Sequence, residues 1–226
     1  MGNSPIEDIQ ELMNQESSAT LRIYTLGDFK IFINDRLVTS KEWGRDKTIQ
    51  LFQFFVTARN RNGLHKEQIY NRLWDEVDDQ NGDRDFKVAL HGINKILEPE
   101  RQSRSNTRYI VRQGLSYQLD MSQVWVDNNA FESAIAIAND NSNNNFQEAK
   151  HAYKYALSLY HGSFLPDRIY MDWTSAERER LQLLALGAYM TLAQMELEDQ
   201  PYECIRLCQA AQQIDYSWEE SYTLQI

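Results

Sequence analysis

The chain has 226 residues, of which 42% are hydrophobic and 25% charged, and its net charge is −10. This composition is that of a soluble globular protein, and the length suffices for two ordinary domains. No apolar run approaches the roughly 20 residues of a membrane-spanning helix, and acidic residues precede the first apolar segment, which disfavours a secretory signal. We therefore expect no membrane partner and a cytoplasmic location.

The charge is unevenly distributed along the chain. Residues 20–120 carry a net charge of +3, whereas residues 1–19 and 121–226 carry −4 and −9. Only the middle part could therefore bind a polyanion. Because its positive excess is small, binding would depend on where the cations lie.

Residues 1–20 predict a short acidic helix followed by a polar linker over residues 15–20. Ser4, Pro5 and Glu7 form a capping box with proline at the first helical position. From Leu21 the hydrophobic period changes to two, and turn residues at 27–28 and 34–35 interrupt the alternation. This pattern predicts a small antiparallel sheet over residues 21–38.

Three helices and a hairpin follow this sheet. Apolar spacing predicts helices over residues 46–59, 65–74 and 84–97, with an acidic loop over residues 75–83. His65 is interpreted as a helix-capping or surface residue rather than a metal ligand. Alternation over residues 109–119, with a turn at Gln113-Gly114, predicts a two-stranded ribbon. Residues 21–120 thus have the element order of a winged helix-turn-helix.

Residues 121–226 show only helix signals. The apolar spacing predicts helices over residues 127–138, 146–159, 175–197, 202–214 and 218–224, joined in several places by very short turns. Such helix pairs are typical of a tetratricopeptide-like stack. The predicted fold class is therefore α+β, with a winged helix-turn-helix and its N-terminal antiparallel sheet followed by an all-α helical-repeat domain.

The sequence shows no recognisable catalytic motif. We find no Ser-His-Asp or Cys-His arrangement, no HExxH and no phosphate-binding glycine loop. The two cysteines, Cys204 and Cys208, have no histidine or third cysteine close to them in the sequence. We therefore expect no enzymatic activity, no cofactor and no metal site.

The helix predicted over residues 84–97 and the ribbon after it carry the functional signal. An apolar stripe leaves a set of polar residues for the other faces of this helix: Arg84, Lys87, His91, Asn94 and Lys95. Such side chains can bind phosphates or base edges, although a solvated helix face is the alternative. Arg108 and Arg112 lie in or beside the ribbon. A cationic ribbon directly after such a helix favours DNA binding over the alternative.

The chain resembles a known family over residues 21 to 226. The runs LRIYTLGDFKIFIND, IYNRLWDE, DFKVALHGINKIL and YIVRQGLSYQL are similar to the OmpR-type winged helix of the SARP-type transcriptional activators. The later runs VWVDNNAFESAI, ALSLYHGSFLPD and DWTSAERERL resemble the bacterial transcriptional activation domain (BTAD) of those proteins. The family usually continues for further helices. A shortened member, a fragment and a stack capped by a partner therefore all stay open.

The resemblance implies an activator that binds direct repeats in promoter DNA head-to-tail, as a dimer on DNA, and recruits RNA polymerase. It gives DNA-contact roles to Arg84, Lys87, His91 and Lys95, and a wing role to Arg112. In OmpR-type proteins the loop before the recognition helix contacts the sigma subunit. Here that loop contains acidic candidates for the same role: Asp75, Glu76, Asp78 and Asp79. A solvated acidic turn is the alternative.

Three positions depart from the family pattern. Gly92 and Asn94 stand where these activators often have arginine, and Ser116 replaces a common wing glycine. Fewer cations predict weaker phosphate contact. Two other functions therefore stay open: a protein-interaction scaffold with a degenerate winged helix, and a regulatory part of a larger signalling ATPase complex.

Overall fold

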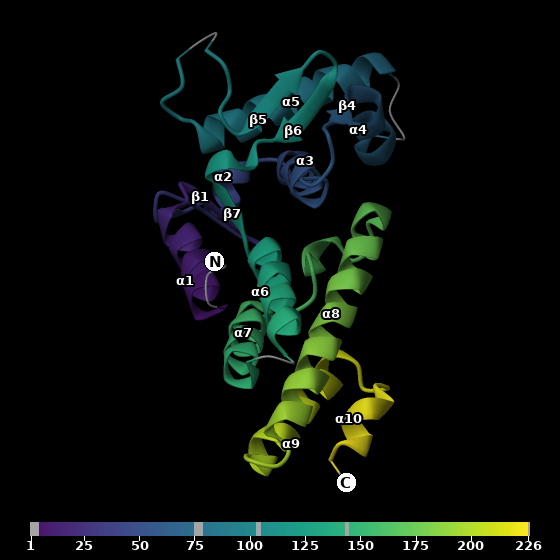
Figure 1. Cartoon of the computed structure of the whole chain (residues 1–226). Coiled ribbons are helices and arrows are strands. Elements are labelled where there is room, and N and C mark those ends of the chain that lie inside the picture. The colour runs from purple at the N-terminus through teal and green to yellow at the C-terminus, as the bar shows by residue number, and fades with distance from the viewer. Residues whose placement is uncertain (1–4, 75–78, 103–104, 143–144, 226) are drawn as a thin grey trace. The chain divides into compact units, whose positions relative to one another are not determined.

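The computed structural model describes residues 5–74, 79–102, 105–142 and 145–225 (Figure 1). The helices are α1 (Pro5–Ser18), α2 (Ser40–Trp43), α3 (Asp46–Thr57), α4 (Lys66–Leu73), α5 (Asp79–Leu97), α6 (Asp127–Asn141), α7 (Phe146–Leu159), α8 (Asp172–Glu196), α9 (Pro201–Ile214) and α10 (Glu219–Thr223). The strands are β1 (Leu21–Tyr24), β2 (Lys30–Ile33), β3 (Arg36–Leu37), β4 (Leu64–His65), β5 (Ile110–Gln113), β6 (Ser116–Leu119) and β7 (Val124–Val126). They form two sheets, in the orders β3-β2-β1-β7 and β4-β6-β5.

The chain packs as two compact units. One comprises residues 1–30 and 125–226 and is called the helical unit below; the other comprises residues 31–124 and is called the winged-helix unit. The fold class is the predicted one: a small sheet and a winged helix-turn-helix, followed by a helical-repeat domain. The sequence predicts domain limits at residues 20 and 120, and these limits stay a prediction.

The sequence prediction of the elements was wrong in three places. Helix α1 continues to Ser18, through most of the predicted linker, and α5 begins at Asp79 inside the predicted acidic loop. Polar residues carry no periodic signal there, so the sequence pattern could not show the helix continuing. The wing turn is Gly114-Leu115 rather than Gln113-Gly114, because Gln113 pairs with Ser116 in the ladder. Gly114 has φ +62°, as a two-residue hairpin turn with glycine first requires.

Two local predictions are confirmed in the winged-helix unit. Asn34 and Asp35, with φ 47° and 61°, form the turn between the antiparallel strands β2 and β3. His65 is the N-cap of α4, and its imidazole accepts a hydrogen bond from the Glu67 backbone N–H. The Gln68 side chain completes a capping box.

The core of the winged-helix unit forms where α3, α4, α5 and the β4-β6-β5 sheet meet. Phe52, Phe55 and Ile69 are buried there with Phe86 and Ile93 of α5. The Phe86 ring meets the rings of Tyr70, Trp74 and Tyr117 edge-on, with centroids 5.0–6.4 Å apart. The Phe86 ring therefore packs α5 against both α4 and the wing.

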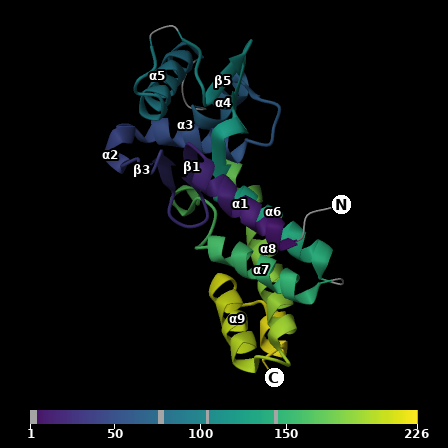
Figure 2. The ribbon, with the colours of Figure 1, turned by 60° about the vertical axis from the view of Figure 1, so that its left-hand side comes forward.

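The helical unit is built on closely packed helix pairs. Helices α6 and α7 pack together, as do α8 and α9, and α1 lies against α6 and α7 (Figures 1 and 2). Small side chains allow this close approach, since Ala134, Ala152, Ala185 and Ala193 are fully buried. Cys204 and Cys208 are buried free thiols, and burial raises the pKa of Cys208 to about 11. Such a thiol is unreactive. Among the described residues, no helix is both long and apolar enough to cross a membrane.

A carboxylate buried at the start of α6 joins that helix to the residues that follow β1. The Asp127 side chain accepts hydrogen bonds from the Thr25 N–H and hydroxyl, both at 2.7 Å, and from the N–H groups of Leu26 and Asn128 at 2.8 Å. Thr25 and Leu26 lie 102 and 101 positions away from Asp127 in the sequence. Asp127 also lies in the first turn of α6, where a negative charge is favourable.

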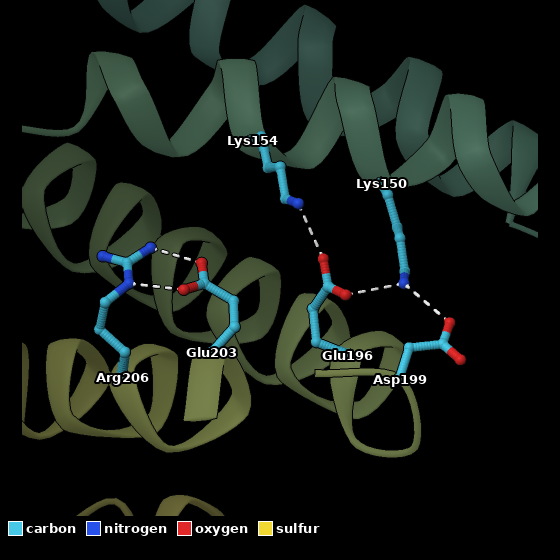
Figure 3. A network of polar contacts seen from close by, with 6 residues as sticks. All are labelled: Lys150, Lys154, Glu196, Asp199, Glu203 and Arg206. Carbon is cyan, nitrogen blue, oxygen red and sulfur yellow. Dashed lines mark hydrogen bonds and ion pairs between the residues drawn. The ribbon is translucent and has the colours of Figure 1, made fainter. Parts of the chain in front are cut away.

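A second set of buried charges joins α7 to the end of α8 (Figure 3). The Lys150 ammonium lies 2.8 Å from one oxygen of Glu196, and the Lys154 ammonium lies 2.8 Å from the other. The side chains of Lys150 and Glu196 are only 7% and 1% exposed. Burial alone would raise the pKa of Glu196, but the two lysines outweigh it and hold that pKa below its ordinary value.

Candidate nucleic-acid interface

Helix α5 has one buried and one exposed face. Phe86, Ala89, Ile93 and Leu97 are buried, as the apolar stripe predicted. The exposed stripe follows the helical spacing of three and four residues and contains Arg84, Lys87, Val88, His91 and Lys95. The structure thus brings four of the predicted DNA-contact residues onto a single face.

The ends of these cations reach into solvent. The side chains of Arg84 and Lys87 are 71% and 69% exposed. Val88, which the sequence analysis did not select, lies among them and is 44% exposed. A β-branched residue at an exposed helix position is a weaker helix former than alanine or lysine. Nothing in the packing of α5 explains an exposed valine there.

Asp83, in the first half of α5, restrains one of these cations. Its carboxylate lies 2.6 Å from the Lys87 ammonium, is paired with Lys66, and accepts a 2.6 Å hydrogen bond from the Tyr70 hydroxyl. Hydrogen bonds from the two lysines hold the pKa of Asp83 below its ordinary value. Lys87 must therefore exchange one anion for another if it is to bind a phosphate.

Of the four acidic residues predicted to contact polymerase, the structure describes only the backbone of one. Asp75, Glu76 and Asp78 lie outside the described residues. Asp79 is the first residue of α5, and its side chain is also outside the described part. Their role stays a prediction.

Asn94 and Gly92 both lie off the exposed stripe of α5. Asn94 is only 8% exposed, so the interpretation that put its side chain on an outward face is wrong. It follows Ile93 and turns with it toward the interior. Gly92 faces α3, because a Cβ atom added to it would lie 3.0 Å from the Thr48 Cγ2 atom. An arginine there would meet α3 rather than DNA, so Gly92 is not a missing phosphate contact.

The wing places a cation beside the N-terminal half of α5. The Arg112 guanidinium lies 5.7 Å from the centre of the Tyr117 ring, and its Nε donates a 2.7 Å hydrogen bond to the Gly114 carbonyl. Tyr117 in turn meets Phe86 edge-on at 5.0 Å. The Tyr117 ring therefore connects the wing arginine to the helix that carries the exposed stripe, through a cation–π contact on one side and an edge-on aromatic contact on the other.

Arg108 lies elsewhere. It precedes β5, its guanidinium is 5.8 Å from the Tyr109 ring, and its backbone N–H donates to Glu98 just beyond the end of α5. It lines a hollow at that end of the helix together with Leu97 and Arg101. The structure therefore does not group Arg108 with Arg84 and Arg112.

Comparison with known proteins gives one domain match in the sequence and one match to a solved structure. Residues 126–222 match the family model of the bacterial transcriptional activator domain. The structure of Mycobacterium tuberculosis EmbR in complex with a low-affinity phosphopeptide has a similar fold, with a TM-score of 0.76 over 92% of this chain. The two sequences are 17% identical, and this chain spans 54% of the EmbR chain. No curated protein matches the chain.

The domain match covers the residues after the winged helix, and the fold shared with EmbR covers 92% of the chain. The chain thus carries a match to the bacterial transcriptional activator domain over residues 126–222, and it shares the fold of EmbR. The whole of the matched range lies in the helical unit.

The two SARP-like segments at 156–167 and 172–181 are physically joined. The guanidinium of Arg178 donates to the carbonyl groups of Phe164, Leu165, Arg168 and Ile169 and to the Thr174 hydroxyl, at 2.7–3.4 Å. Leu165 has φ 44°, a left-handed conformation that is costly for a side chain of its size. Arg178 holds that turn in place. These hydrogen bonds give Arg178 a structural role between α7 and α8.

Proposed function

We propose that the chain binds double-stranded DNA through the exposed stripe of α5 and Arg112 of the wing, and activates transcription from bacterial promoters. The supporting observation is the single exposed face that carries Arg84, Lys87, His91 and Lys95. In this proposal α5 lies in the major groove, whose width admits a helix. Arg112 then contacts the backbone or the minor groove beside it.

The parts of this face have different roles. Lysine and arginine ends neutralise phosphates and so supply most of the affinity. Arg84 and His91 can also donate to base edges, and Val88 offers an apolar contact for a thymine methyl group. Asn94 is left out of the contact set, since its side chain is buried.

The resemblance to SARP-type activators suggests how binding becomes activation. Two copies would occupy direct repeats head-to-tail, and acidic residues before or at the start of α5 would contact the sigma subunit of RNA polymerase: Asp75, Glu76, Asp78 and Asp79. Substitution of these four by asparagine or glutamine should abolish activation in a reconstituted transcription assay without weakening promoter binding. Because the target is the bacterial chromosome, we place the protein in the cytoplasm, without enzymatic activity or a cofactor.

The test begins with selection of binding sites from random duplex DNA by the purified chain. Affinity for the selected site is then measured by fluorescence anisotropy across a range of salt concentrations. Arg84→Ala, Lys87→Ala and Arg112→Ala should each weaken binding and lower the slope of log affinity against log salt by about one. Arg206→Ala, in the helical unit, removes the same charge from a surface pair and should change neither quantity.

Two results would contradict the proposal. Recovery of no common sequence, together with no binding at low salt, would favour the scaffold alternative, which the acidic helical unit and the Asp83–Lys87 pair make reasonable. Sequence-specific binding that all three alanine variants retain unchanged would mean that another surface contacts DNA.

A further inference from the structure

A hollow of about 530 Å³ lies in the winged-helix unit, where α5 ends and the wing begins. Ile33, Leu97, Pro99 and Tyr109 form its apolar walls. Its volume is in the range of small-molecule pockets, which are mostly apolar and carry a few oriented polar groups. The described residues that line it include none from the exposed stripe of α5.

Three arginines surround this hollow, and they differ in what they already bind. Arg36 is paired with Glu42 at 2.6 Å. Among the described residues, the Arg101 guanidinium donates to one neutral acceptor, the Ser105 carbonyl at 2.6 Å. Arg108 lies over the Tyr109 ring and forms no ion pair with any described residue. Arg101 and Arg108 are therefore two guanidinium groups that form no ion pair with a described carboxylate.

Two glutamates also line the hollow, but in the described part of the chain neither forms an ion pair with Arg101 or Arg108. One oxygen of Glu98 accepts the backbone N–H groups of Arg108 and Tyr109, at 2.9 and 3.4 Å. That carboxylate is thus engaged in holding the start of the wing to the end of α5. Glu100 is exposed to solvent. What the hollow offers a ligand is apolar wall and guanidinium donors.

We propose that this hollow binds a small amphipathic carboxylate. A guanidinium group matches a carboxylate with two parallel hydrogen bonds, and such charge-assisted bonds are stronger than neutral ones. The carboxylate binds Arg108 and Arg101, and the apolar body of the ligand packs on Leu97 and the Tyr109 ring. Arg108 is then a ligand-binding residue rather than a DNA contact. The assignment does not depend on whether α5 binds DNA.

The experiment uses 2-naphthoate as the probe and the full chain without DNA. Backbone amide resonances are followed by two-dimensional NMR during titration. We expect saturable shifts at residues 97–101 and 108–109, with a dissociation constant of about 1 mM, as is usual for a ligand of this size. The neutral analogue 2-naphthamide should bind about tenfold more weakly, since it lacks the charge-assisted pair.

Variants locate the site within the unit. Arg108→Met and Arg101→Met should each weaken naphthoate binding by about tenfold, and the unchanged part of each spectrum reports that the variant is folded. Arg61→Met is the matched control, because Arg61 is exposed in the same unit and does not line the hollow. It should bind naphthoate as the wild type does.

Several outcomes would overturn the proposal. One is equal affinity for naphthoate and naphthamide; another is the same loss of binding in Arg61→Met as in Arg108→Met. Shifts confined to residues outside the hollow would also do so. A second copy of the chain filling the hollow would make naphthoate affinity fall as protein concentration rises, and that result would assign the surface to self-association instead.

Discussion

The two units of this protein use charge in opposite ways. In the helical unit, Asp127, Lys150 and Glu196 are buried and fully engaged with partners inside the fold. In the winged-helix unit, the cations of α5 are exposed, and their partners lie at the surface, where they can be exchanged. The net negative charge of the chain therefore does not argue against DNA binding. Some of the acidic side chains hold the helical unit together, while the cations of the other unit stay accessible.

The largest effect expected from this contrast is at Asp127. Asp127→Ala removes a carboxylate that accepts four hydrogen bonds and leaves buried N–H groups without a partner. We expect a loss of about 4 kcal/mol in the unfolding free energy of the helical unit. Urea denaturation followed by circular dichroism measures it. Asp140→Ala is the control, because Asp140 is exposed on the same helix. A loss for Asp127→Ala as small as that of the control would contradict the assigned role.

The next largest loss of stability is expected at the ion pair between Lys150 of α7 and Glu196 of α8. Lys150→Met leaves Glu196 buried with Lys154 as its remaining partner, so we expect a loss of about 3 kcal/mol rather than the larger cost of an isolated buried charge. Lys150→Met combined with Glu196→Leu should recover most of that loss, since two packed apolar groups can replace a buried ion pair. Urea denaturation again reports the difference. A double variant as unstable as Lys150→Met would mean that the pair is not energetically coupled.

This pair also predicts a pH dependence. The two lysines hold the pKa of Glu196 below its ordinary value in the folded protein. Its contribution to stability is therefore fully present above the ordinary pKa and is lost as the pH falls through the folded-state pKa. Between pH 5 and 3 the wild type should lose more stability than the double variant. Parallel curves for the two proteins would show that other carboxylates account for the acid sensitivity.

Features that depend on residues close together in the sequence could be predicted correctly. The apolar stripe of α5, the Asn34-Asp35 turn and the His65 cap follow from local spacing and turn chemistry. The sequence did not show which side of α5 Gly92 and Asn94 occupy, because that depends on how closely α3 approaches. The bonds of Asp127 to Thr25 join residues 102 positions apart, and no local pattern reports such a contact.

A smaller effect is expected at Gly92, where the winged-helix unit is closely packed. Gly92→Ala gains about 1 kcal/mol of helix propensity, but its Cβ crowds Thr48 Cγ2 at 3.0 Å, and overpacking typically costs about 1–3 kcal/mol. We expect a net loss of about 1 kcal/mol. Thr48→Ser removes the crowded methyl group, so a double-mutant cycle in urea should show coupling of about 1 kcal/mol in favour of the pair. Additive single effects would contradict the close approach of α3 and α5.

The smallest change concerns the exchangeable pair on α5. Asp83→Asn removes the anion that holds Lys87 and Lys66, so Lys87 can bind a phosphate without first breaking an ion pair. We expect tighter DNA binding and a salt slope that rises by up to about one. Asp35→Asn makes the same change in net charge at the β2–β3 turn, where asparagine also accepts a positive φ. If both variants raise affinity equally, the gain comes from net charge alone, and Asp83 does not restrain the DNA-facing stripe.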